Sequence, residues 1–288
     1  MKYESGISVC ITAYKAKEFI KETLDSVAAQ TWFKTHDNWE VIVGVDGCRE
    51  TLEYLTGIAD NYRNLNIYMM DSNKGTYVTT NTIMSLARYD GLIRFDSDDL
   101  MLPRMVEKIM AIRKRYDVIK FKMRNFGSRD DAYVACGQIY MRHTTFDEFG
   151  GYKPWVCGAD SDFFKRVSKF VRVKVMDDIL FNRRVHDGSL TTSKSTGGGS
   201  STRRKYAEMI RRMDVRSKND AVISRETNSC KEIRGGKETA TVVIGKKPSA
   251  AKNDVKKKKP AAKGLSTKST KYNKERPGGK GWSEFFGL

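Results

Sequence analysis

The stretch Leu92-Ile93-Arg94-Phe95-Asp96-Ser97-Asp98-Asp99 joins a short apolar segment to three acidic residues within four positions. Residues 92–95 are typical of a buried strand. Three carboxylates so close together repel one another at neutral pH, and a divalent cation that prefers oxygen ligands, Mn²⁺ or Mg²⁺, relieves that repulsion. The alternative is a solvated turn in which Asp99 caps the helix that follows. We predict a metal site at Asp96, Asp98 and Asp99, at the carboxyl end of a strand.

The chain before this stretch alternates between strand and helix patterns. Short apolar, β-branched runs predict strands, and amphipathic spacing predicts helices between them. The predicted strands and helices are, in order, residues 6–13, 16–30, 39–45, 50–62, 65–70, 76–88 and 92–95. This alternation favours an α/β fold with a mostly parallel sheet flanked by helices. Such sheets bind ligands at the carboxyl ends of their strands, so every loop at that edge is a candidate site.

Charge is distributed unevenly along the chain. Residues 1–215 hold 34 basic and 28 acidic residues, whereas residues 216–288 hold 19 and 7. We therefore predict a catalytic domain at 1–215 and a basic, low-complexity, largely disordered tail at 216–288, with at most a short strand at 239–244. A basic tail attracts polyanions, either nucleic acid or anionic membrane. The alternative is a solvated tail that keeps the protein soluble.

The cysteines and the hydropathy pattern indicate the cellular compartment of the protein. Scattered cysteines without a C-x-x-C pair indicate free thiols in a reducing environment. They are Cys10, Cys48, Cys136, Cys157 and Cys230. No segment approaches the length of a membrane span, and the N-terminus lacks the apolar core of a signal peptide. We expect a soluble protein of the cytoplasm, in a bacterial or a virus-infected host cell. The sequence does not indicate an oligomeric state.

The motifs between residues 6 and 190 resemble, in order and spacing, those of a family 2 glycosyltransferase with the GT-A fold. In that family a D-x-D-type turn binds the diphosphate of a nucleotide-sugar through a metal ion. The resemblance implies that Asp96, Ser97 and Asp98 contact the donor. It also implies a UDP-sugar as the default donor and Mn²⁺ or Mg²⁺ as the cofactor.

Three further segments match the family's donor site. Residues Thr12-Ala13-Tyr14, at the end of the first strand, resemble the segment whose backbone and aromatic ring hold the nucleobase. Asp46 resembles an acid that reads the edge of the base, although the family usually has two Asp residues here and this chain has one. Asn73-Lys74-Gly75, with Asn81, resembles the loop and helix near the diphosphate.

The resemblance also points to residues beyond the donor turn. Asp160, at the start of a predicted helix at 160–170, matches the general base of an inverting transferase, and Asp162 is the alternative. Asp162 has a second interpretation as an acid favoured by the helix dipole. His186 is a candidate metal ligand, and Arg183 or Arg184 could pair with phosphate through the planar guanidinium.

These features predict transfer of a sugar to an acceptor hydroxyl with inversion. The acceptor is open between a hydroxylated base in DNA, held by the basic tail, and an envelope glycan or small molecule. The competing hypothesis is an inactive GT-A-like binding module whose basic tail binds a polyanion. The second Asp missing beside Asp46 favours that alternative, whereas Asp98 and Asp160 argue against it.

Overall fold

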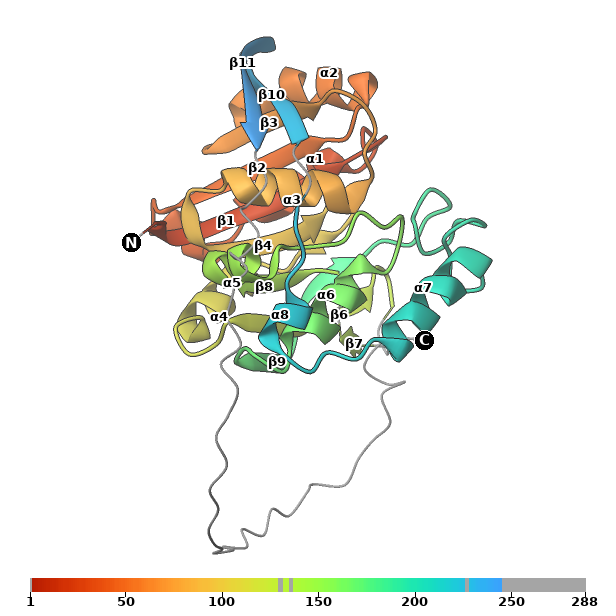
Figure 1. Ribbon diagram of the computed structural model, residues 1–288. Coiled ribbons are helices and arrows are strands. Elements are labelled where there is room, and N and C mark those ends of the chain that lie inside the picture. Colours follow the sequence, from red (N-terminus) through yellow and green to blue (C-terminus); the bar gives the residue numbers. More distant parts are fainter. Residues whose placement is uncertain (1, 129–131, 135–136, 226–227, 245–288) are drawn as a thin grey trace, which may run out of the picture.

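A computed structural model describes residues 2–128, 132–134, 137–225 and 228–244 (Figure 1). Its strands all belong to one sheet. In chain order the strands are β1 (Glu4–Ala13), β2 (Trp39–Val45), β3 (Leu65–Met70), β4 (Tyr89–Asp96), β5 (Leu100–Met101), β6 (Val118–Asn125), β7 (Ala132–Val134), β8 (Ile139–Arg142), β9 (Val173–Arg183), β10 (Asn228–Arg234) and β11 (Lys237–Ile244). The α-helices are α1 (Ile20–Ala28), α2 (Arg49–Ile58), α3 (Thr76–Leu86), α4 (Met105–Ile112), α5 (His143–Phe149), α6 (Ala159–Val167), α7 (Ser201–Arg212) and α8 (Lys218–Ala221).

The centre of the sheet is parallel. Strands β3, β2, β1 and β4 lie side by side in that order, with Val9 opposite Val41 on one side and Ile93 on the other. Beyond this centre the pairing is mixed, because β8 runs antiparallel to β4 and β10 antiparallel to β3. The α/β prediction is confirmed, with a mixed sheet whose parallel part contains the four strands expected from the sequence.

Helices cover both faces of the sheet. One core layer packs α1, α2 and α4 against side chains such as Val9 and Ile93. The other packs α3, α5 and α6 against the alternate positions, such as Cys10 and Leu92. Since successive side chains of a strand point to opposite faces, both layers draw on the same apolar runs. The carboxyl ends of β1, β2 and β4 are therefore held at one edge by a core on each side.

The sheet continues past residue 215, where the sequence predicts a boundary. Strand β10 pairs with β3, with Cys230 opposite Met70, and β11 pairs with β10; Figure 1 shows this blue hairpin next to β3. Cys230 and Ile233 are buried. This corrects the expectation of disorder immediately after residue 216. The basic low-complexity part of the predicted tail, residues 245–288, lies outside the described residues.

Among the described residues, no helix has the length and apolar character needed to cross a lipid bilayer.

The surroundings of the His143 ring lead to a prediction of how the free energy of unfolding depends on pH. It is fully buried and stacks on Tyr3 at 3.5 Å between ring centroids, and Nδ1 donates to the carbonyl of Tyr89 at 3.1 Å. Nε2 has no hydrogen-bond partner within the described part of the chain, so protonation there would bury an unpaired N–H. Burial lowers the pKa of His143 from 6.5 to about 4. The folded state therefore prefers the neutral ring.

Because the folded-state pKa of His143 lies below the unfolded value, acid favours the unfolded chain. We expect the free energy of unfolding to fall by about 3 kcal/mol as the pH drops from 6.5 to 4, and this contribution to level off below pH 4. Urea unfolding at several pH values should show the decline in the wild type and a flatter curve for His143→Phe. An equal slope in both proteins would assign the decline to other groups.

Candidate active site

The acidic turn that follows β4 is held by side chains on both sides of Asp96. Arg94 Nη2 lies 2.7 Å from Asp96 Oδ1, and Gln138 Nε2 donates to Asp96 Oδ2 at 2.6 Å. Both oxygens of Asp96 therefore already have protein partners. Asp96 is still 33% exposed and each of its oxygens has a second lone pair, so its role as a metal ligand stays a prediction.

Asp99 is an anchor of the same turn. Its side chain is 2% exposed, and its oxygens accept from the backbone N–H of Arg184 at 2.8 Å and from Gln138 Nε2 at 2.5 Å. Burial, reinforced by Asp98 and Asp96, raises the pKa of Asp99 well above its usual range. Helix α4 begins only at Met105, so Asp99 does not cap it. The predicted metal ligand Asp99 is instead enclosed and joins the turn to the end of β9.

Asp98 and His186 face each other at the open side of the turn. Asp98 Oδ2 lies 2.9 Å from His186 Nε2, and each side chain keeps about a quarter of its surface exposed. The carbonyl of Ser97 accepts from Thr23 Oγ1 at 2.9 Å, which fixes the backbone beside Asp98. A carboxylate oxygen and an imidazole nitrogen both suit Mn²⁺.

The protein side chains at the acidic turn suit a cation that is also coordinated by the diphosphate of the substrate. Within the described ranges, no group of three or more His, Cys, Asp or Glu residues is arranged to hold a metal ion. Two protein ligands are nevertheless enough where diphosphate oxygens and water complete the coordination, as is usual for Mg²⁺ sites with phosphate substrates. Of the four predicted metal ligands, Asp99 is buried, Asp96 is 33% exposed but held by Arg94 and Gln138, and Asp98 and His186 are about a quarter exposed and face each other.

The two predicted phosphate-binding arginines differ in their contacts. Arg184 pairs with Glu22, and its guanidinium lies 4.9 Å from the ring centroid of Phe19 and 5.3 Å from that of Phe126. Arg183 Nη2 donates to Thr191 Oγ1 at 2.5 Å and is partly exposed. Both flank the Asp98–His186 pair through β9, and Arg184 Nε also donates to the carbonyl of Asp98 at 3.1 Å.

At the end of β1, one of the three predicted donor residues presents its side chain to solvent. Tyr14 is 47% exposed, whereas Ala13 is fully buried in the core. Thr12 Oγ1 lies 2.9 Å from Thr80 Oγ1 and joins β1 to α3. The ring of Tyr14 is therefore free to stack on a flat ligand, and Thr12 and Ala13 can contribute through their backbone.

Asp46 holds a loop instead of facing the open edge. Its carboxylate is 2% exposed and accepts from the backbone N–H groups of Lys74 at 2.7 Å and Gly75 at 2.9 Å, and from Thr79 Oγ1 at 2.8 Å. These contacts place Asn73 and Lys74, both exposed, beside the end of β2. The oxygens of Asp46 thus already accept hydrogen bonds from this loop and from α3, and the reading of a base edge by Asp46 stays a prediction.

The two candidate bases on α6 have opposite surroundings. Asp160 accepts one hydrogen bond, from the hydroxyl of Tyr77 at 3.1 Å. Asp162 is fully buried, and its oxygens meet Lys153 Nζ and Arg166 Nε at 2.7 Å each. A carboxylate enclosed by two cations has no free oxygen for an acceptor. The geometry thus favours Asp160 as the base and gives Asp162 a structural role.

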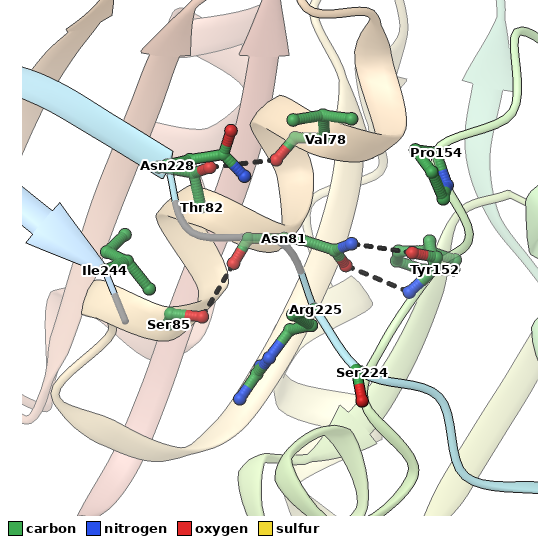
Figure 2. Close-up of a pocket in the computed structure, with 10 residues that line it drawn as sticks. All are labelled: Val78, Asn81, Thr82, Ser85, Tyr152, Pro154, Ser224, Arg225, Asn228 and Ile244. Carbon is green, nitrogen blue, oxygen red and sulfur yellow. Dashed lines mark hydrogen bonds between the residues drawn. The ribbon is translucent and has the colours of Figure 1, made fainter. Parts of the chain in front are cut away.

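The amide of Asn81, expected near the diphosphate, points elsewhere. It exchanges hydrogen bonds of 2.7 and 2.9 Å with the backbone of Tyr152 (Figure 2). Asn81 lines a small cavity of about 70 Å³, together with residues that include Arg225 and Asn228. Sites for drug-sized ligands usually enclose several hundred Å³, so this cavity is too small for a nucleotide-sugar.

Three residues of the site are not among the predicted site residues: Tyr77 on α3, Arg94 on β4 and Gln138 just before β8. Arg94 is the one with a signal in the sequence, because it is a charged residue inside an apolar strand. Tyr77 and Gln138 come close to the acids only through long-range packing.

The parallel centre of the sheet, with an acidic turn at the end of β4 and an acid at the start of α6, defines a GT-A-type glycosyltransferase domain. The chain belongs to glycosyltransferase family 2, since the family model "Glycosyl transferase family 2" matches residues 8–165. An uncharacterized glycosyltransferase of Haemophilus influenzae is 30% identical over 144 residues, which are 49% of this chain and 42% of that protein. The chain therefore aligns with less than half of this relative's length.

Solved structures show the same fold. Residues 1–349 of S. aureus TarS in complex with UDP match with a TM-score of 0.56 and 20% identity, over 63% of this chain and 61% of that chain. The mannosyltransferase PcManGT from Pyrobaculum calidifontis, in complex with GDP-Man and Mn²⁺, matches with a TM-score of 0.59 and 14% identity, over 74% and 66%. At these identities the match supports the GT-A fold.

Proposed function

We propose that this chain is an inverting glycosyltransferase that moves a sugar from a nucleotide-sugar, by default a UDP-sugar, to an acceptor hydroxyl. The closeness of the acidic turn to the candidate base carries the proposal. A Cβ atom at Gly137 would lie 2.5 Å from Arg94 Nη1, whose guanidinium pairs with Asp96, and 3.4 Å from Asp160 Oδ2. Asp96, at the end of β4, and Asp160, at the start of α6, are therefore near each other. This arrangement suits a reaction in which one side of the site holds the leaving diphosphate and the other accepts a proton.

In this reaction Asp160 accepts the proton of the acceptor hydroxyl while that oxygen bonds to the anomeric carbon and the bond to the diphosphate breaks. The hydroxyl of Tyr77 donates to Asp160 Oδ1 and leaves Oδ2 for the acceptor. Asp98 and His186 would hold Mn²⁺ or Mg²⁺, which supplies charge neutralisation for the departing diphosphate. Asp99 and Gln138 keep the turn in position beneath them.

The donor proposal draws on the relatives. TarS was solved with UDP and with UDP-GlcNAc, and PcManGT with GDP-Man and Mn²⁺. The exposed ring of Tyr14 at the end of β1 suits stacking on a nucleobase. We therefore infer a nucleotide-sugar with a divalent cation and keep UDP as the first choice.

For the acceptor, we infer a hydroxyl of a glycan or a small molecule. None of the relatives named above points to a nucleic acid, so the hydroxylated DNA base stays a prediction from the basic tail alone. We prefer an active enzyme to the inactive-module alternative, because Asp98 and Asp160 are both present and Asp46 has a structural contact with the loop at Lys74 and Gly75. The free thiols Cys10, Cys157 and Cys230 are buried and compatible with the cytoplasm that we propose.

Release of nucleotide diphosphate tests the proposal directly. The full chain is incubated with UDP-GlcNAc, UDP-glucose or GDP-mannose, with Mn²⁺ or with EDTA, and with water as the acceptor. We expect at least one donor to give a rate about 10-fold or more above the EDTA control, because the cation stabilises the leaving diphosphate. Equal rates with Mn²⁺ and EDTA for every donor would contradict the metal-dependent mechanism.

A further inference from the structure

Arg94 is a buried cation with unused hydrogen-bond donors. Its side chain extends from the apolar strand β4 and is only 5% exposed. Nη2 pairs with Asp96 at 2.7 Å, whereas Nε and Nη1 have no hydrogen-bond partner within the described part of the chain. Burying a charge whose hydrogen-bond donors are not all paired is costly, so the position of Arg94 calls for an explanation other than stability.

The unpaired Nη1 and the candidate base border the same space. A Cβ atom at Gly137 would lie 2.5 Å from Arg94 Nη1 and 3.4 Å from Asp160 Oδ2, so both groups border the space that Gly137 leaves open. The guanidinium also lies 5.8 Å from the ring centroid of Tyr77, whose hydroxyl donates to Asp160. Arg94 thus pairs with the carboxylate at the end of β4 and lies near the one that opens α6.

A comparison with a second buried arginine separates this arrangement from an ordinary structural ion pair. Arg113 lies beside the opposite end of β4, where Nη1 meets Asp90 at 2.6 Å and Nη2 donates to Ser5 Oγ at 2.9 Å. It is buried almost as deeply as Arg94. Each terminal nitrogen of Arg113 has an acceptor, whereas Arg94 Nη1 has none among the described residues and borders the site.

We propose that Arg94 is a positioning residue that ties the base Asp160 to the donor-side acid Asp96, and that Gly137 is required because any side chain there would displace the guanidinium. This inference rests on the proposed function. One cation between two carboxylates offsets their mutual repulsion and fixes both on the same side of the site. Donor binding through Asp98 and His186 would be unaffected, whereas proton transfer would depend on the link.

The kinetic test compares matched variants in the nucleotide-release assay. Arg94→Met removes the charge at similar length, Arg94→Lys keeps the charge without the planar fork, and Gly137→Ala adds only the obstructing Cβ. We expect Arg94→Met and Gly137→Ala to lower kcat by about 30-fold or more with KM for the donor within about 3-fold, and Arg94→Lys to recover part of the loss. The control Arg113→Met should lose stability and keep kcat within about 2-fold.

A readout that needs no turnover keeps the inference separate from the proposed function. Arg94→Met, Asp160→Asn and the double variant are compared by melting temperature. We expect the double variant to lose clearly less than the sum of the single losses, because the two groups interact. Additive losses would overturn the link, even if the protein is active. If no donor is turned over by the wild type but the losses are non-additive, the proposed function fails and the link between Arg94 and Asp160 stands.

Discussion

Replacing Asp160 with Asn is expected to lower kcat for nucleotide release by about 100- to 10,000-fold, the range that general-base catalysis contributes. The amide has almost the same shape and can still accept from the hydroxyl of Tyr77, but it cannot take a proton. Donor affinity should change little, because the groups proposed to hold the diphosphate lie on the acidic turn, at the end of β9 and in the segment that follows it. The measurement is a steady-state comparison of kcat and KM for the donor.

Asp162→Asn is the matched control, two residues along the same helix. Asp162 is fully buried between Lys153 and Arg166, and removal of one partner from a buried ion pair costs about 3–5 kcal/mol. We expect a large fall in melting temperature, with kcat per folded molecule close to that of the wild type. The opposite pattern, in which Asp162→Asn abolishes turnover and Asp160→Asn leaves it intact, would move the base to Asp162.

The parts of the fold that the sequence predicts well are those coded by local patterns. Of the four apolar runs of the parallel centre, β1, β2 and β4 are mostly buried on both faces and β3 is half-buried, so their strand character is visible in a short window of sequence. The acidic turn and Asp160 are likewise local, since each directly follows or opens an element. Their proximity follows from the rule that loops at the carboxyl ends of parallel strands converge.

Long-range pairing explains what the sequence pattern misses. Strand β10 is polar apart from Cys230 and Ile233, and it becomes a strand because β3 offers an edge to pair with. Asp46 looks like a ligand-binding acid in sequence, yet its partners are backbone N–H groups of a loop almost thirty residues later. Gln138 acquires its role only because β8 runs antiparallel beside β4. None of these long-range contacts produces a periodic pattern in the sequence.

The contacts of the acidic residues in the structure rank them as candidate metal ligands. Asp96 and Asp99 have both oxygens occupied by protein donors, whereas Asp98 and His186 face each other with a quarter of their surfaces exposed. We therefore expect Asp98→Asn to lower kcat/KM for Mn²⁺-dependent nucleotide release by about 100-fold or more, and His186→Ala by about 10-fold. Asp98→Asn should lower Mn²⁺ affinity in parallel, because it removes the partly exposed carboxylate that faces His186.

Titration of free Mn²⁺ by electron paramagnetic resonance, with the donor nucleotide present, measures that affinity without turnover. The exposed Asp187, next to His186, provides a control of equal charge: Asp187→Asn should keep Mn²⁺ affinity and kcat/KM within about 3-fold. Asp96→Asn should weaken catalysis while retaining most of the affinity for the ion, since its carboxylate is held by Arg94 and Gln138. If Asp96→Asn instead abolishes Mn²⁺ binding and Asp98→Asn does not, the ion is held on the inner side of the turn, and the contact between Arg94 and Asp96 must open when the donor binds.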